Sequence, residues 1–151
     1  MDLTQIEGKR IFITGGAGFI GSTLAGLLYE KNEIVVFDNF ARDSIKDKPY
    51  RDHKNLKLIK GDVLDAPAVT EAMKGANLVV HCAAIAGIDT VTKSPVRTLR
   101  VNMLGSANVL EAAAALPKCE RVVCFSTSSP ARVDPMKPAP PVMKMRLPSI
   151  C

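Results

Sequence analysis

Glycines at positions 15, 18 and 21 set the strongest constraint on how this chain folds. They stand in the run TGGAGFIG at residues 14–21, which satisfies both the GxGxxG and the GxxGxxG spacing. The run follows a short β-branched and aromatic stretch, RIFIT at 10–14, which predicts a buried strand. Residues 19–31 then carry apolar side chains at helical spacing. A strand, a glycine turn and a helix are therefore expected to follow one another without interruption.

Such a turn lets a ligand approach the backbone. The first glycines permit a tight turn, Gly18 leaves room for a pyrophosphate, and Gly21 lets the helix pack closely on the strand. The helix N-terminus then offers N–H groups to the phosphates. Asp38, 23 residues after Gly15, can accept hydrogen bonds from the ribose hydroxyls and would repel a 2′-phosphate. The pattern predicts NAD binding, although Arg42 weakens the preference over NADP, and a turn without ligand is the alternative.

Further apolar runs alternate with helical segments along the chain. Strands are expected at 33–37, 56–59, 77–82 and 121–125, and helices at 66–74, capped by Asp65, and from 94 to about 116. Alternation of continuous apolar strands with helices is typical of a parallel sheet covered on both faces. We therefore expect an α/β fold, a Rossmann-type doubly wound parallel sheet of about five strands. Residues 38–55 have no apolar period and predict a long loop.

The segment 129–151 differs in composition from the rest of the chain. It holds six of the ten prolines and no aromatic residue. Proline can neither continue a helix nor donate to a sheet ladder, so no long helix or central strand is expected there. We predict an NAD-binding domain over 1–128 and an irregular, proline-rich tail over 129–151.

Charge and cysteine content exclude several classes of partner. The net charge of +5 divides into +2 for residues 1–128 and +3 for the tail, and no basic stripe with aromatics predicts a nucleic-acid partner. No apolar run approaches the roughly 20 residues that span a bilayer, and the first residues lack a signal-peptide core, so no membrane partner is expected. The four cysteines lack metal-ligand spacing, so we expect no metal site and a cytoplasmic location.

Six short motifs follow one another over about residues 8–128: TGGAGFIG, DNF, GDVLD, HCAAIAG, NMLGSANVLEAA and FSTS. In this order and at this spacing the chain resembles the extended short-chain dehydrogenase/reductases, the NAD-dependent sugar-nucleotide epimerases and dehydratases, of which UDP-glucose 4-epimerase is a typical member. The resemblance implies NAD as the cofactor. It also implies that the C-terminal part of the family fold, which contacts the sugar nucleotide, is missing here.

The resemblance assigns cofactor contacts residue by residue. Asp62 and Val63 match the pair that contacts adenine, small residues after the fourth strand lie along the cofactor, and Asn102 matches the helix asparagine of an NxxG pattern. From the residues alone, the alternatives are a turn residue for Asp62 and a solvated helix residue for Asn102. His81 is expected to be packed rather than catalytic. The implied cofactor-binding residues are Gly15, Gly18, Phe19, Ile20, Gly21, Asp38, Asn39, Asp62, Val63, Cys82, Ala83, Ala84 and Asn102.

The catalytic set implied by the resemblance is incomplete. Thr127 matches the Ser/Thr that hydrogen-bonds the substrate hydroxyl undergoing oxidation. The family also uses a tyrosine and a lysine, spaced YxxxK, on the helix after the fifth strand. This chain has no tyrosine beyond Tyr50. The literal YxxxK from Tyr50 to Lys54 lies in the loop before the third strand, and we interpret it as a coincidence.

We therefore expect the NAD-binding portion of a sugar-nucleotide epimerase/dehydratase-like oxidoreductase that is inactive as written. The resemblance stops after Ser128, and a frameshift or truncation of the coding sequence is our hypothesis for that break. A nucleotide-sugar substrate is expected only if the missing half is supplied. The strand at 121–125 would then have an unpaired edge, which favours a homodimer. A hydroxysteroid dehydrogenase-like reductase with another proton donor and a non-catalytic NAD-sensing or interaction module are the alternatives.

Overall fold

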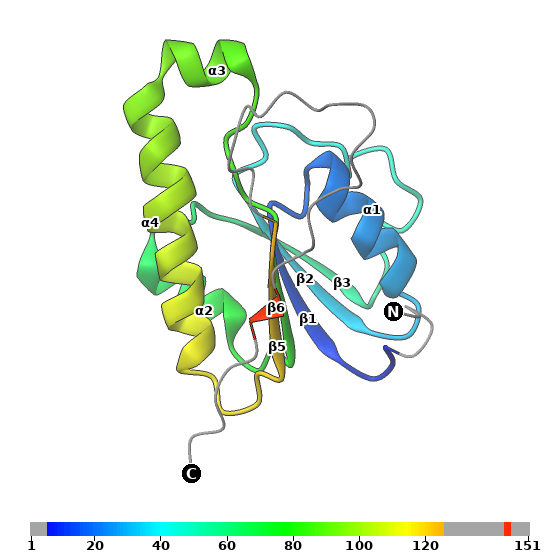
Figure 1. The fold of residues 1–151 in the computed structure, drawn as a ribbon. Helices are drawn as coiled ribbons and strands as arrows, with labels where there is room; N and C mark the ends of the chain where they lie inside the picture. Colours follow the sequence, from blue (N-terminus) through cyan, green and yellow to red (C-terminus); the bar gives the residue numbers. More distant parts are fainter. Residues whose placement is uncertain (1–5, 126–143, 146–151) are drawn as a thin grey trace, which may run out of the picture.

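A computed structural model describes residues 6–125 and 144–145, and it shows one sheet with helices on both faces (Figure 1). The strands are β1 (Arg10–Thr14), β2 (Glu33–Asp38), β3 (Leu56–Lys60), β4 (Leu78–His81), β5 (Arg121–Cys124) and β6 (Lys144–Met145). Their order across the sheet is β3-β2-β1-β4-β5-β6. The first five strands are parallel. The prediction of a Rossmann-type doubly wound parallel sheet of about five strands is confirmed.

Helices cover the two faces unequally. They are α1 (Phe19–Leu28), α2 (Ala66–Met73), α3 (Ile88–Lys93) and α4 (Pro95–Ala114). Figure 1 shows α1 on one face of the sheet and α2 and α4 on the other. The short α3 was not predicted. The sequence pattern predicts no helix or strand between the fourth strand and the long helix that begins at residue 94. Ser94 separates α3 from α4, since the residue before a proline avoids the helical region and Ser94 has φ −146° and ψ 64°.

Alternating side chains of the central strand supply both hydrophobic cores. Phe12 points into the core shared with α2 and α4, where it meets Val109 and other fully buried side chains. Ile11 and Ile13 point the other way, into the core beneath α1 that includes Ala25. Because both faces of the sheet are covered at its centre, the interior positions of β1, β2 and β4 are apolar, which explains the continuous apolar runs of these strands in the sequence.

The long loop between β2 and β3 is confirmed, and it folds back onto the α1 side of the sheet. Its Ile45 is fully buried in the core beneath α1. The backbone N–H of Ser44 donates to the Ala17 carbonyl oxygen at 2.8 Å. Tyr50 stacks on Tyr29 with ring centroids 5.1 Å apart. These contacts anchor a loop that the sequence pattern left without structure.

The edge of β5 is paired, contrary to the expectation from the sequence. Lys144–Met145 forms the antiparallel strand β6 beside Val122 and Val123. A two-residue strand at a sheet edge is compatible with a proline-rich segment, because proline is excluded only from central strands. The prediction of an unpaired edge is therefore wrong along these residues. The remainder of the predicted tail, like Thr127, lies outside the described residues.

Helix α4 is joined to the strand ends by a chain of hydrogen bonds through His81. The Ser106 hydroxyl donates to the Asn102 carbonyl oxygen at 2.6 Å and so accepts from His81 Nε2 at 2.9 Å. His81 Nδ1 then accepts from the Thr14 hydroxyl at 2.6 Å. In this series of hydrogen bonds each donor has one acceptor. The proton of the neutral His81 ring is therefore assigned to Nε2. Burial lowers the pKa of His81 and keeps the ring neutral.

Helix α4 also comes close to the loop after β3. A Cβ placed on Gly105 would lie 2.6 Å from Cγ2 of Val63 and 3.2 Å from its Cβ. Beside this contact, Asn108 Nδ2 donates to the Val63 carbonyl oxygen at 2.9 Å. The glycine thus lets the helix approach the loop closely enough for a direct hydrogen bond.

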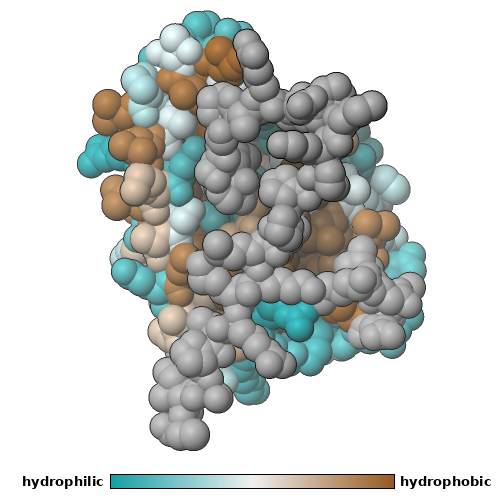
Figure 2. Space-filling model, in the orientation of Figure 1, coloured by the Kyte–Doolittle hydropathy of each residue, from teal (hydrophilic) through white to brown (hydrophobic). Residues whose placement is uncertain are grey.

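The outer side of α4 is apolar. Val96, Leu99 and Met103 recur at helical spacing and are 71%, 60% and 63% exposed, and Figure 2 shows brown side chains over this helix.

Within the described residues, no helix has the length and hydropathy needed to cross a membrane.

We predict that Gly105→Ala lowers the free energy of unfolding by about 1 to 2 kcal/mol. Overpacking against Val63 outweighs the helix propensity that alanine gains over glycine, roughly 1 kcal/mol. In a Val63→Ala background the Cγ2 contact at 2.6 Å is gone and only the milder Cβ contact at 3.2 Å remains, so the same substitution should be close to neutral or stabilising. Urea denaturation of the four proteins measures this coupling. Equal effects of the substitution in both backgrounds would contradict the proposed contact.

We also predict that His81 makes stability depend on pH. Its pKa is lower in the folded chain than the value of about 6.5 expected when unfolded, so the unfolded chain binds the proton first. This contribution is complete above about pH 6.5 and declines as the pH falls toward the folded pKa, with a slope of at most about 1.4 kcal/mol per pH unit. Denaturation of the unchanged chain and of His81→Gln between pH 8 and pH 5 tests this. An identical pH slope in the two proteins would exclude His81 as its source.

Candidate functional site

The carboxyl ends of β1 to β4 border a cleft of about 610 Å³. Its volume lies in the range of small-ligand sites, roughly 300–1,000 Å³. Open parallel sheets bind ligands at this edge. Every sequence-predicted cofactor-binding residue except Asn102 lines it, namely Gly15, Gly18, Phe19, Ile20, Gly21, Asp38, Asn39, Asp62, Val63, Cys82, Ala83 and Ala84.

The glycine turn forms the floor of the cleft. Gly15 has a φ of 65°, which favours glycine, and a Cβ there would lie 2.6 Å from the backbone N of Ala83. A Cβ on Gly21 would lie 2.5 Å from the Gly15 carbonyl oxygen. Helix α1 begins after Gly18 without a side-chain cap, so its first N–H groups are left for a ligand. At both positions a Cβ would collide with backbone, so the glycines let the turn, α1 and the segment after β4 pack closely around a polar cradle formed by the free N–H groups of α1.

Asp38 is fixed beside this cradle by the backbone on both sides. Its Oδ2 accepts from the Ala17 N–H at 3.0 Å, and its Oδ1 accepts from the Phe40 N–H at 2.8 Å. A carboxylate oxygen has two lone pairs, so each keeps one for a further donor. Neighbouring Asn39 turns its side-chain oxygen to the Ala41 N–H at 2.9 Å. The Asp38 carboxylate is thus preorganised to accept hydrogen bonds from a pair of hydroxyls.

Asp62 serves the local turn and also borders the cleft. Its Oδ1 accepts from the Leu64 N–H at 3.0 Å, as expected for an Asp that stabilises a turn. The carboxylate nevertheless lines the cleft beside Val63. The two interpretations considered from the sequence are therefore compatible.

The segment after β4 is fixed at both of its ends. Cys82 N–H donates to the Thr14 carbonyl oxygen at 3.0 Å. At the other end, Asn102 Oδ1 accepts from the Ile85 N–H at 2.8 Å, and Asn102 Nδ2 donates to the Ile85 carbonyl oxygen at 3.0 Å. Asn102 thus lies behind the cleft wall and holds the segment in place. It is not a solvated helix residue.

The titratable groups in and near this wall are in unreactive forms. Burial, with a smaller effect of the neighbouring Cys124, raises the pKa of the Cys82 thiol to about 12. Cys82 is therefore protonated at neutral pH, and the thiol is a poor nucleophile. His81 has both ring nitrogens engaged by Thr14 and Ser106. Its position in the interior matches the expectation of a packed histidine.

Tyr50, which begins the literal YxxxK sequence, lies away from the cleft. Its hydroxyl donates to the Ser22 carbonyl oxygen, and its ring lies against Gly26 of α1. Burial, and to a smaller extent Tyr29, raise the pKa of the Tyr50 phenol. These contacts support the interpretation of this YxxxK as a coincidence.

Several cleft residues were not predicted from the sequence. Thr90 belongs to the unpredicted α3. Ser44 lies in the loop that folds back onto the α1 side, and the apolar Ile45 beside it in a charged stretch could have indicated that this loop packs on the core. Arg97 and Val101 reach the cleft from α4. They stand four residues apart, a spacing that places them on one helix face, but their face could not be assigned without the sheet.

Comparison with known proteins places this arrangement. The chain is 35% identical over 123 residues to the UDP-N-acetyl-alpha-D-glucosaminuronate decarboxylase of Bacillus cytotoxicus. This match covers 80% of this chain and 37% of the decarboxylase. It is also 35% identical over 125 residues to the UDP-glucose 4-epimerase of Rickettsia canadensis, and this match covers 79% of this chain and 36% of the epimerase. The Bordetella bronchiseptica enzyme WbmG, solved in complex with NAD, is similar in structure with a TM-score of 0.67 and 32% identity, covering 83% and 39%.

The chain spans little more than a third of the length of these relatives. A family model described as the NAD dependent epimerase/dehydratase family matches residues 11–139. This match covers most of the chain and includes the glycine turn and the cleft residues. The chain therefore belongs to the NAD-dependent epimerase/dehydratase family.

Proposed function

We propose that this chain binds NAD in the cleft, as the cofactor-binding portion of an oxidoreductase that acts on nucleotide sugars. The observation that carries the proposal is the cradle of Gly15, Gly18 and Gly21 beside the fixed Asp38 carboxylate. Gly15 and Gly21 allow the close backbone packing that keeps the uncapped N-terminus of α1 at the cleft, where a pyrophosphate can accept from its N–H groups. Each oxygen of the Asp38 carboxylate keeps a lone pair for a further donor, and this suits the two hydroxyls of a ribose.

The cofactor parts follow the order of the strands. The pyrophosphate lies at the first turn of α1, and the adenosine ribose donates its hydroxyls to Asp38. Adenine then lies toward the β3 edge, beside Asp62 and Val63. The nicotinamide half runs past Ala83 and Ala84, where small side chains leave room. When bound, NAD supplies a hydride acceptor at its nicotinamide ring.

The relatives support a nucleotide sugar as the substrate class. Two of them are named for reactions of UDP-sugars. Thr127 is proposed as the residue that hydrogen-bonds the reacting hydroxyl, because it matches the Ser/Thr of the family motif that follows the fifth strand in the sequence. The cysteines of the described segments are free, which supports the proposed cytoplasmic location. The exposed apolar side of α4 supports a homodimer as the proposed assembly.

We further propose that the chain of 151 residues binds NAD without turning over a substrate. A phenol close to the reacting hydroxyl would be needed to take its proton, and Tyr50 is held against Ser22 and Gly26 on the far side of α1. The protonated Cys82 does not replace it.

We predict that Asp38→Ser weakens NAD binding by about tenfold or more, because a hydrogen bond to a charged group contributes roughly 1.5–3 kcal/mol. NADP binding should weaken less or improve, since the repulsion of its 2′-phosphate is removed. Isothermal titration with both cofactors measures the ratio of affinities. Asp52→Ser is the matched control, because Asp52 is exposed in the same loop and outside the cleft. An unchanged ratio for Asp38→Ser would contradict the assigned ribose contact.

We predict that the purified chain shows no reduction of NAD with UDP-glucose or related UDP-sugars, while it binds NAD by titration. Chromatography of the UDP-sugars after hours at high protein concentration measures turnover in which the hydride returns to the sugar, and absorbance at the NADH band detects reduced cofactor that accumulates. Tyr50→Phe is compared in parallel. Turnover by the unchanged chain that is lost in Tyr50→Phe would overturn both the proposed inactivity and the structural role of Tyr50.

A further inference from the structure

The side of the cleft that faces α4 has a feature that the family resemblance did not assign. Two residues of α4, Arg97 and Val101, line the cleft opposite the loop that carries Asp62. Val101 is buried and Arg97 is exposed, and four residues separate them. Side chains at this spacing lie one above the other on a helix. Val101 therefore forms the inner wall of the cleft, and Arg97 lies above it at the mouth.

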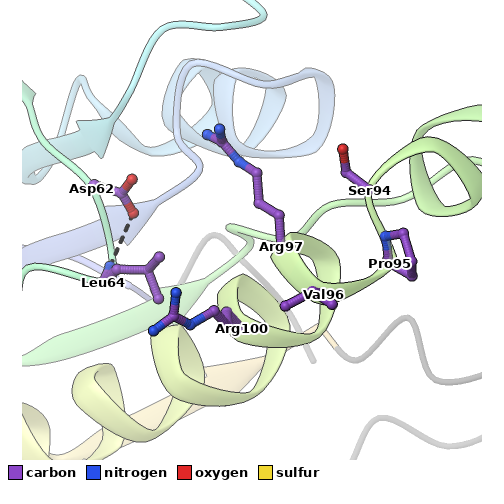
Figure 3. Close-up of a pocket in the computed structure, with 7 residues that line it drawn as sticks. All are labelled: Asp62, Leu64, Ser94, Pro95, Val96, Arg97 and Arg100. Atoms are coloured by element: carbon purple, nitrogen blue, oxygen red, sulfur yellow. Dashed lines mark hydrogen bonds between the residues drawn. The ribbon is translucent and has the colours of Figure 1, made fainter.

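The guanidinium of Arg97 is free to meet a ligand. No hydrogen bond or ion pair of Arg97 occurs among the residues that the structure describes. Asp62, which lines the same two hollows as Arg97, accepts a hydrogen bond from the Leu64 N–H through its Oδ1. Figure 3 shows the Arg97 side chain leaving α4 on the side that faces Asp62 and Leu64. A planar cation thus borders the region in which adenine is proposed to lie.

The chemistry of this wall suits the face of a purine. Guanidinium is planar and weakly hydrated, and it stacks on aromatic faces. Below it, Val101 and Val63 offer apolar contacts from the two sides of the cleft. Arg97 lines both hollows together with Asp62, which is proposed to border adenine, and this shared lining favours the adenosine half of the cofactor as its partner.

We infer that Arg97 binds the adenine of NAD by stacking its guanidinium on the face of the base that is turned toward α4. This inference rests on the proposed function, because it requires NAD in the cleft. It makes α4 a part of the cofactor site in its own right, in addition to its role of positioning the segment after β4 through Asn102.

Arg100 offers a matched control on the same helix. It lies three residues further along α4, is exposed, and has no hydrogen bond or ion pair among the described residues. It borders a neighbouring hollow of about 520 Å³ together with Arg97 and Asp62, but it does not line the cleft. The two arginines therefore contribute the same charge near Asp62, and of the two only Arg97 lines the cleft.

The test is titration of the full chain and of Arg97→Ala, Arg97→Lys and Arg100→Ala with NAD, AMP and nicotinamide mononucleotide. Arg97→Ala should weaken binding of NAD and AMP by the same factor, roughly five- to thirtyfold, and leave nicotinamide mononucleotide unchanged. Arg97→Lys should not restore the loss, because lysine keeps the charge without the planar group. Arg100→Ala should stay within twofold of the unchanged chain. Melting temperatures without ligand should be equal in all four proteins.

The outcomes separate this inference from the proposed function. NAD binding by the unchanged chain with no loss in Arg97→Ala would overturn the stacking role alone. Full recovery in Arg97→Lys, or a loss that disappears at high ionic strength, would also overturn it and indicate a charge contact to phosphate. Absence of NAD binding by the unchanged chain would overturn the proposed function, and the inference with it.

Discussion

Three backbone segments meet beneath the cleft, and the rest of the site depends on how closely they approach. The turn after β1 touches the segment after β4 at Gly15 and the first turn of α1 at Gly21. At both points the obstructing atoms would be backbone, which cannot rotate away as a side chain can. Any larger residue must separate a helix from a strand or one strand end from the next. The relative positions of the segments that line the cleft therefore depend on these two glycines.

Polar contacts transmit this arrangement across the sheet. Thr14 closes β1 and is hydrogen-bonded to His81 at the end of β4, and His81 is bonded to Ser106 on α4. The chain of donors is complete without any charge, so it adds directional constraint in the interior without the desolvation cost of an ion. Asp38 performs the equivalent function on the other side of the turn, because its two oxygens hold Ala17 and Phe40.

The parts of the site that depend on local sequence were predicted well, and those that depend on tertiary contacts were not. The glycine turn, the Asp65 helix cap and the parallel sheet of about five strands follow from spacing and residue type. Ile45 and Arg97 acquire their positions only when a loop or helix packs on the sheet. Strand β6 could not be predicted, since two residues carry no period and their pairing depends on the exposed edge of β5.

Asn102 carries on its side chain the same donor and acceptor that a peptide group carries in the backbone. By bonding both the N–H and the carbonyl oxygen of Ile85, it pairs this residue as a neighbouring strand would, although Ile85 lies in no strand. The Ile85 amide should therefore exchange its hydrogen as slowly as the amides of β4, and the protected region should extend beyond the end of the strand. An aspartate here would keep the acceptor and lose the donor, so that only the amide side of this pairing would remain.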